Sequence, residues 1–130
     1  MRTIALVAHD GMKTSLIEWV RYNYERIKHY KLVSTRTTGE TIKKCMNIEV
    51  QTVESGPLGG DARIATMILD RQIDMLIFFK DHMTAQPHSV DVDMLTRQAD
   101  IHNIPAAYNR ASADYLISSS LLDVVLKGVA

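Results

Sequence analysis

The segment that most constrains the fold is residues 75–79, a continuous apolar run with the sequence MLIFF. Such a short run is typical of a strand buried on both faces of a parallel sheet, because helices cover both faces of these sheets. Further short apolar runs predict strands at residues 4–8, 32–35, 48–53 and 104–108.

Segments with helical periodicity alternate with these strands. Between residues 13 and 27 the apolar residues recur at helical spacing, which predicts a helix with one buried face. Thr38 is the expected cap of a later helix. The predicted helices cover residues 13–27, 39–46, 63–71, 90–103 and 111–117. The residues expected to pack inward are Leu16, Ile17, Trp19, Val20, Tyr24, Ile27, Cys45, Val92, Leu95 and Ile101.

Strands that alternate with helices in this way predict an α/β fold. We expect a single three-layer αβα domain spanning residues 1–130, with a central, five-stranded, mostly parallel and doubly wound sheet.

The composition excludes several functional classes. Lysine plus arginine and aspartate plus glutamate balance at 15 each, so the chain has no basic footprint for nucleic acid. Cys45 is the only cysteine, which excludes an intramolecular disulfide and a cysteine metal cluster. The first apolar run is too short for a signal peptide or a membrane span, so we expect a cytoplasmic protein with no membrane partner.

The polar residues gather where the predicted strands end. His9 and Asp10 follow the first predicted strand, and residues 35–39 follow the second. Residues 55–61 follow the third strand, and residues 81–88 follow the fourth. Ligands of open α/β sheets bind outside the carboxyl ends of the strands. These clusters are therefore expected to converge on one rim.

The segment Thr35-Arg36-Thr37-Thr38-Gly39 is rich in hydroxyl groups and leads into a helix. Hydroxyls and backbone N–H groups at a helix N-terminus suit a phosphate, although a plain helix cap explains the same pattern. Ser55 and Gly56 could add a second set of N–H donors. Lys13 lies in a first helical turn, where the helix dipole favours an anion, so either an anionic ligand binds there or the lysine is simply solvated.

Residues 55–61 (SGPLGGD) form a turn with three glycines, and Asp61 stands at its end, at the mouth of a helix. This is a suitable place for a catalytic or ligand-binding carboxylate. Asp81, His88 and Asp91 form another candidate acid–base group, in which His88 could instead cap the following helix. The carboxylates could also hold a metal, but no recognised ligand spacing is present, so a site without metal or cofactor is preferred.

Taken together, these residues closely resemble the methylglyoxal synthase family. The matching motifs are Ala5-Leu6-Val7-Ala8-His9-Asp10 with Lys13, Thr35-x-Thr37-Thr38-Gly39, Ser55 to Asp61, Ile77-Phe78-Phe79-x-Asp81, Pro87-His88-x-x-Asp91-Val92, and Ile104-Pro105 with Asn109. The resemblance implies a carbon–oxygen lyase that converts dihydroxyacetone phosphate to methylglyoxal and inorganic phosphate. It also implies homohexamers, no cofactor, and inorganic phosphate as inhibitor and allosteric effector.

The resemblance also implies roles for individual residues. Asp61 would be the general base, and we expect partial desolvation to raise its pKa. The other implied catalytic residues are His88, Asp91 and Asp10. The implied substrate- and phosphate-binding residues are His9, Lys13, Thr35, Arg36, Thr37, Thr38, Gly39, Ser55, Gly56 and Asp81.

Two of the positions that depart from the family pattern carry a positive charge. Arg36 replaces a glycine, so it could strain or block the pocket, point outward, or add a phosphate contact. Arg63, after Asp61, replaces a polar residue and could bring another cation to the site. Two alternatives therefore stay open: a non-catalytic effector-binding sensor of the same fold, as in carbamoyl phosphate synthetases, and a metal-dependent phosphohydrolase.

Overall fold

The computed structural model describes residues 2–84 and 89–121. Its centre is a five-stranded sheet in the order β3-β2-β1-β4-β5, in which every neighbouring pair is parallel. The strands are β1 (Thr3–Ala8), β2 (Lys31–Thr35), β3 (Gln51–Val53), β4 (Met75–Phe79) and β5 (Ala106–Ala107). The predicted α/β fold with its five strands is confirmed.

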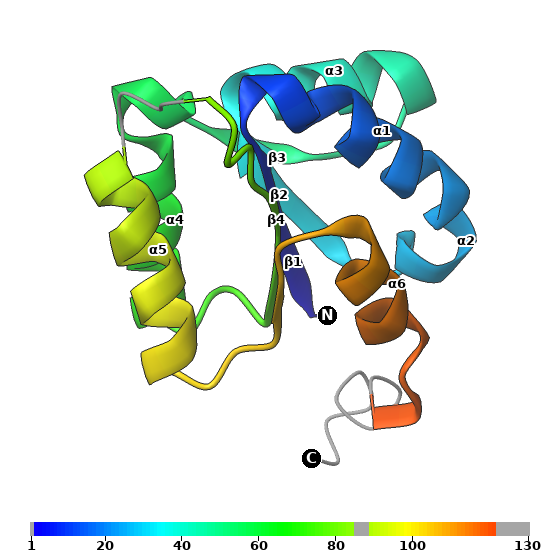
Figure 1. Cartoon of the computed structure of the whole chain (residues 1–130). Helices are drawn as coiled ribbons and strands as arrows, with labels where there is room; N and C mark the ends of the chain where they lie inside the picture. The colour runs from blue at the N-terminus through cyan, green and yellow to red at the C-terminus, as the bar shows by residue number, and fades with distance from the viewer. Residues whose placement is uncertain (1, 85–88, 122–130) are drawn as a thin grey trace.

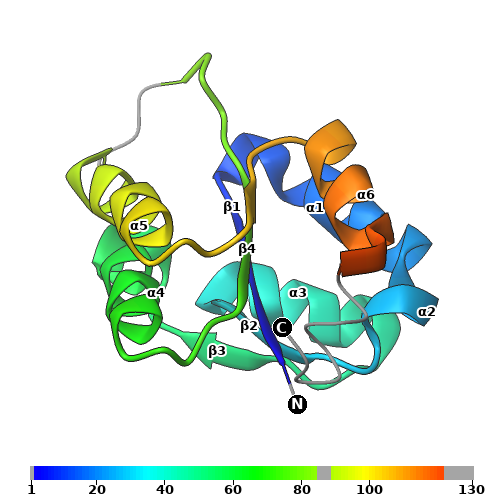
Figure 2. The same ribbon diagram turned by 90° about the horizontal axis from the view of Figure 1, so that it is seen from below.

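Helices cover both faces of the sheet (Figure 1 and Figure 2). The α-helices are α1 (Lys13–Tyr22), α2 (Tyr24–Ile27), α3 (Arg36–Met46), α4 (Gly60–Leu69), α5 (Ser89–Ile101) and α6 (Arg110–Ser118). Two short 3₁₀ helices, η1 (Asp10–Met12) and η2 (Gly56–Leu58), directly precede α1 and α4. Helices α4 and α5 lie on one face, and α1, α3 and α6 lie on the other. With helices on both faces of a parallel sheet, the structure is the predicted doubly wound, three-layer αβα domain.

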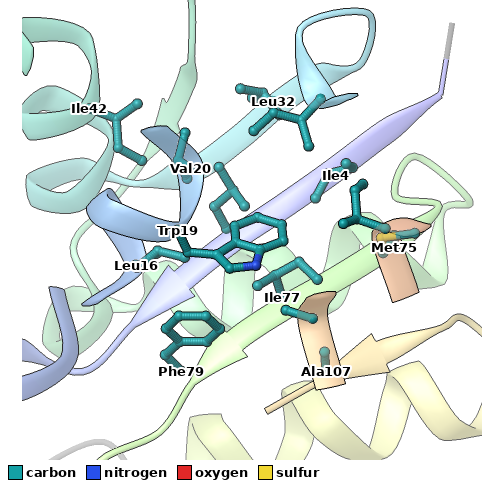
Figure 3. Packing of buried hydrophobic residues seen from close by; sticks show 14 of the residues in the cluster. Ile4, Leu16, Trp19, Val20, Leu32, Ile42, Met75, Ile77, Phe79 and Ala107 are labelled. Atoms are coloured by element: carbon teal, nitrogen blue, oxygen red, sulfur yellow. The ribbon is translucent and has the colours of Figure 1, made fainter. Parts of the chain in front are cut away.

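Alternate residues of the central strands point to opposite faces of the sheet and pack into two separate hydrophobic cores. Ile4 and Leu6 of β1 pack under α1, α3 and α6, whereas Ala5 and Val7 pack under α4 and α5. Trp19 is fully buried in the first core, surrounded by aliphatic side chains and the ring of Phe79 (Figure 3). Its indole Nε1 donates a hydrogen bond to Asp114 Oδ1 over 2.8 Å, so the buried N–H group has an acceptor.

The strand order reverses next to β1. The chain steps outward from β1 to β2 and β3, then returns to place β4 on the opposite side of β1. A crevice at the carboxyl ends of the strands is expected at such a reversal. Here the N–H of His9, which follows β1, donates to the carbonyl of Phe79, which ends β4.

Two helix boundaries differ from the predictions. The predicted helix 13–27 is interrupted at Asn23, whose side chain is buried and donates to the carbonyl of Trp19. This side chain competes with the helical backbone for an acceptor. The predicted helix 39–46 begins instead at Arg36, because β2 turns directly into it with Thr35 as the N-cap residue. The prediction of Thr38 as the cap is therefore wrong, and Thr38 is buried inside the helix.

Some predicted core residues and strand lengths were also wrong. Cys45 is exposed beside Lys43 and Lys44, and Ile101 is 55% exposed, while Ala99 is buried in its place. The two outer strands are shorter than predicted because each pairs with a neighbour on one side only. Among residues 2–84 and 89–121, no helix is both long and apolar enough to cross a bilayer.

Candidate active site

A cavity of about 360 Å³ opens where β1, β2 and β3 end. Its lining residues come from the carboxyl ends of β1 and β2, from the loops after the strands, and from the beginnings of the helices that follow. They are Val7, Ala8, His9, Asp10, Lys13, Thr35, Thr37, Ser55, Gly56, Pro57 and Asp61. Clusters that are far apart in the sequence therefore meet at one rim, as predicted from the strand ends.

Asp61 lies in the first turn of α4, and only 1% of its surface is exposed. The turn before it places it there. Gly59 adopts a φ of 101°, which glycine tolerates, and the N–H of Gly60 donates to the carbonyl of Ser55 over 2.8 Å. A Cβ atom on Gly60 would collide with the carbonyl of Glu54, so only glycine fits. The result is a buried carboxyl group at a helix N-terminus that faces the cavity.

His9 is 6% exposed and is held from two sides. Its Nδ1 accepts a hydrogen bond from the backbone N–H of Asp81 over 2.8 Å. Its ring also meets the Phe78 ring edge-on, with centroids 5.1 Å apart. An Nδ1 that accepts a hydrogen bond carries no proton, so the neutral imidazole carries its proton on Nε2.

Lys13 is the first residue of α1, an end of the helix that favours anions. Its Nζ lies 2.8 Å from Asp10 Oδ1, so a carboxylate already stands beside the cation. Both residues line the cavity. Lys13 is therefore neither a simply solvated lysine nor an uncompensated positive charge.

The threonine-rich segment splits into lining and supporting residues. Thr35 and Thr37 line the cavity at the beginning of α3. Thr38 and Gly39 are buried behind them and do not line it. A Cβ on Gly39 would come within 2.5 Å of Thr52 Cγ2, so this glycine lets α3 pack closely on β3.

The remaining predicted site residues that the structure describes are not among those that line the cavity. Asp81 accepts a hydrogen bond from the N–H of Met83 through Oδ1, and its Oδ2 packs against Gly11. Asp91 is half-buried in the first turn of α5. Neither is among the lining residues. His88 lies outside the described residues.

Comparison with known proteins identifies the family. A family model described as MGS-like domain matches residues 15–108. The chain is 51% identical over 120 residues to a methylglyoxal synthase from Proteus mirabilis, covering 92% of this chain and 79% of that protein. It is 48% identical over 123 residues to one from Coxiella burnetii (strain RSA 493 / Nine Mile phase I), covering 95% and 86%. The chain belongs to the methylglyoxal synthase family. The predicted family is thus confirmed, and with it the prediction of a lyase.

A solved structure of a family member has the same fold. The crystal structure of methylglyoxal synthase from Elizabethkingia anophelis NUHP1 superposes with a TM-score of 0.88 at 45% identity, covering 93% of this chain and 80% of that one. Within the methylglyoxal synthase fold, Val7, Ala8 and Pro57 line the cavity although we did not predict them as site residues. All three lie inside the matching motifs, so the motifs themselves were the signal.

Arg36, one of the residues that depart from the methylglyoxal synthase pattern, does not put the backbone into a strained conformation. It begins α3 and has no positive φ. Its side chain is exposed and does not line the cavity, so it does not block it. The other departure, Arg63, binds the Glu54 carboxylate through two hydrogen bonds of 3.2 and 2.7 Å. These bonds are the main reason why the pKa of Glu54 falls to about 2.

Two further features bear on the choice of site. Among the described residues, no group of three or more His, Cys, Asp or Glu side chains is placed to hold a metal ion. A larger hollow of about 810 Å³ lies near the amino ends of β2 and β3, beside Lys31, Lys43 and Gln51. Its lining lacks the buried carboxyl group of the smaller cavity, which is therefore the better candidate for catalysis.

Proposed function

We propose that this cavity converts dihydroxyacetone phosphate to methylglyoxal and inorganic phosphate. One observation carries the proposal: the buried carboxyl group of Asp61 faces the same cavity as Lys13, Thr35, Thr37 and Ser55. A base and a set of phosphate-binding groups thus share a space suited to a small phosphorylated substrate.

In the proposed reaction, the Asp61 carboxylate takes a proton from the hydroxymethyl carbon, which is the carbon next to the substrate carbonyl that does not bear phosphate. The electron pair left behind moves onto the carbonyl oxygen and forms an enediolate phosphate. When the enediolate collapses, a new double bond forms to the phosphate-bearing carbon as its carbon–oxygen bond breaks. The phosphate leaves with the electron pair of that bond and takes up the proton held by Asp61. The remaining enol tautomerises to methylglyoxal.

We assign the binding of the substrate phosphate to the N-termini of α3 and η2. The hydroxyls of Thr35 and Thr37 stand at the N-terminus of α3, Ser55 is the N-cap residue of η2, and Gly56 is its first residue. Backbone N–H groups at such positions are ready donors for a phosphate. Lys13 adds a charge-assisted donor, and Asp10 orients it through their 2.8 Å contact.

The oxygen of the enediolate needs a donor of its own. His9 offers Nε2–H, because its Nδ1 is engaged by Asp81. His88 is proposed as a second donor at the carbonyl end, and Asp91 as a further catalytic carboxylate, on the family resemblance alone. No cofactor is required for these steps.

The decisive experiment is to assay the purified protein for methylglyoxal from dihydroxyacetone phosphate, together with Asp61→Asn. The parent should form product, whereas Asp61→Asn should lose turnover but still bind phosphate. Asp70→Asn, the same change at the exposed C-cap of α4, should behave as the parent. Absence of product from the parent would favour the sensor alternative. Release of dihydroxyacetone, abolished by a chelator, would indicate the phosphohydrolase.

We also propose that the protein is a cytoplasmic homohexamer that inorganic phosphate inhibits. These proposals rest on the family resemblance. Light scattering after gel filtration tests the assembly. Initial rates measured over a range of phosphate concentrations test the inhibition.

A further inference from the structure

The described residues that line the cavity carry more negative than positive side-chain charge. Its charged side chains are one lysine, Lys13, and two carboxylates, Asp10 and Asp61. His9 is neutral, since its Nδ1 accepts a hydrogen bond. With both carboxylates ionised, the formal charge of this lining is −1, from one cation and two anions. An incoming phosphate group, itself anionic, is therefore repelled unless other positive charges lie nearby.

Such charges stand just outside the lining. Thr35 of β2 and Val53 of β3 are paired in the parallel register, so the residues that follow them, Arg36 and Glu54, leave neighbouring strands side by side. Arg36 stands between two cavity-lining threonines in sequence, and Glu54 directly precedes the lining residue Ser55. Two of the positions that depart from the family pattern, Arg36 and Arg63, thus lie close enough to Glu54 for their charges to act on it.

The two arginines relate to Glu54 differently. Arg63 binds it through both carboxylate oxygens, a geometry that occupies the acceptors of Glu54. Arg36 forms no ion pair with any of the described residues. Its positive charge nevertheless makes a small contribution to the lowered pKa of Glu54. Because Arg63 occupies Glu54, the guanidinium of Arg36 stays exposed at the start of α3, and its neighbours in sequence, Thr35 and Thr37, line the cavity.

We propose that Arg36 is a specificity-determining residue that recruits the phosphate group of the substrate, and that Arg63 positions it indirectly by keeping Glu54 occupied. This inference rests on the proposed function, because it assumes that phosphate binds in this cavity. Together the two arginines and Glu54 add a formal charge of +1, which offsets the −1 of the lining. The glycine usual at position 36 in the family could not supply this charge.

The test uses charge-removing variants of the full chain, measured by KM for dihydroxyacetone phosphate and by calorimetric Kd for inorganic phosphate. At low salt Arg36→Gln should raise both values by about threefold to tenfold, with kcat little changed. Arg36→Lys should restore most of the loss. Lys44→Gln, which removes an exposed charge farther along α3, is the matched control and should have no effect. In about 1 M salt, where the screening length falls to ~3 Å, the difference from the parent should vanish.

A double variant separates recruitment from a merely structural role. Arg63→Gln releases Glu54, which then captures Arg36, so this variant should also raise KM and the phosphate Kd. Adding Glu54→Gln should restore both values, because Arg36 is then available again. In the Arg36→Gln background, Glu54→Gln should give no such rescue.

The outcomes are distinct. An unchanged KM and Kd in Arg36→Gln, or no rescue of Arg63→Gln by Glu54→Gln, overturns the inference. If the parent makes methylglyoxal and Asp61→Asn does not, the proposed function stands whatever these variants do. If the parent makes no methylglyoxal, the proposed function fails, and the phosphate Kd series still decides the role of Arg36.

Discussion

The backbone N–H of Asp81 donates a hydrogen bond to Nδ1 of His9 over 2.8 Å, which joins the loops that follow β4 and β1. These are the two strands between which the sheet order reverses. One bond thus closes the rim at the reversal and also decides which imidazole nitrogen carries the proton.

Amide substitutions at His9 separate these two tasks. In His9→Asn the side-chain oxygen can replace Nδ1 as the acceptor for Asp81, so stability should be kept while kcat falls by about 10²-fold for want of the Nε2 donor. In His9→Gln the amide oxygen is one bond farther along the side chain and no longer accepts from the N–H of Asp81. This variant should therefore lose about 1 kcal/mol of stability. Urea unfolding and steady-state rates measure the two effects. A parent-like kcat in His9→Asn would contradict the donor role.

Asp61→Asn should reduce kcat by about 10²- to 10⁴-fold, because the neutral amide cannot accept the proton. Its size and burial are kept, so the urea midpoint and the calorimetric Kd for phosphate should stay close to those of the parent. A large fall in stability would mean that the carboxyl group is structural instead. Asp70→Asn is again the control.

The burial of Asp61 supports the expectation that its pKa is raised, because desolvation disfavours the charged carboxylate. The activity of the free enzyme should then fall as the pH drops through that raised pKa. Since substrate phosphate also titrates near pH 6, the carboxyl group should be followed directly, by NMR of carbon-13-labelled aspartate in the substrate-free protein. A midpoint at the ordinary aspartate value of about 4 would refute the expectation.

Gly60→Ala should destabilise the protein by about 1–3 kcal/mol, because the added Cβ collides with the backbone carbonyl of Glu54, which cannot move cheaply. Gly11→Ala is the informative counterpart. There the Cβ would lie 2.7 Å from Asp81 Oδ2, the end of a side chain that can rotate away. Its urea midpoint should change little, whereas any change in kcat reports on the position of Asp81. Equal losses of stability in both variants would contradict this reading.

The ion pair of Glu54 and Arg63 predicts a pH-dependent contribution to stability. Hydrogen bonds from Arg63 lower the pKa of Glu54 from its ordinary 4.5 to about 2 in the folded state. A lowered folded-state pKa stabilises the protein above the unfolded value, and this contribution is lost as the pH falls through the folded value. Unfolding of Arg63→Gln and the parent should therefore differ most above about pH 5 and converge near pH 2. A gap that widens toward acid would contradict the prediction.

The motifs predicted the family and most of the cavity, because they lie at strand ends, where a parallel sheet must bring them together. The local sequence pattern predicted helix boundaries wrongly where tertiary contacts determine them. Asn23 interrupts a periodic helix because its buried side chain bonds to the carbonyl of Trp19. Thr38 resembles a cap but is buried, because β2 leads into α3 three residues earlier than the glycine suggested.

By itself, the sequence determined the alternation of strands and helices, the five strands and the presence of a carboxylate after a glycine-rich turn. These depend on hydrophobic periodicity and on backbone preferences, which are local. Only the tertiary structure decided which strands are neighbours, and therefore that Arg63 binds Glu54 with the charge of Arg36 nearby, and that Asp81 fixes the tautomer of His9. Those relations join residues from separate segments of the chain, and their distances are set by the packing of the whole sheet.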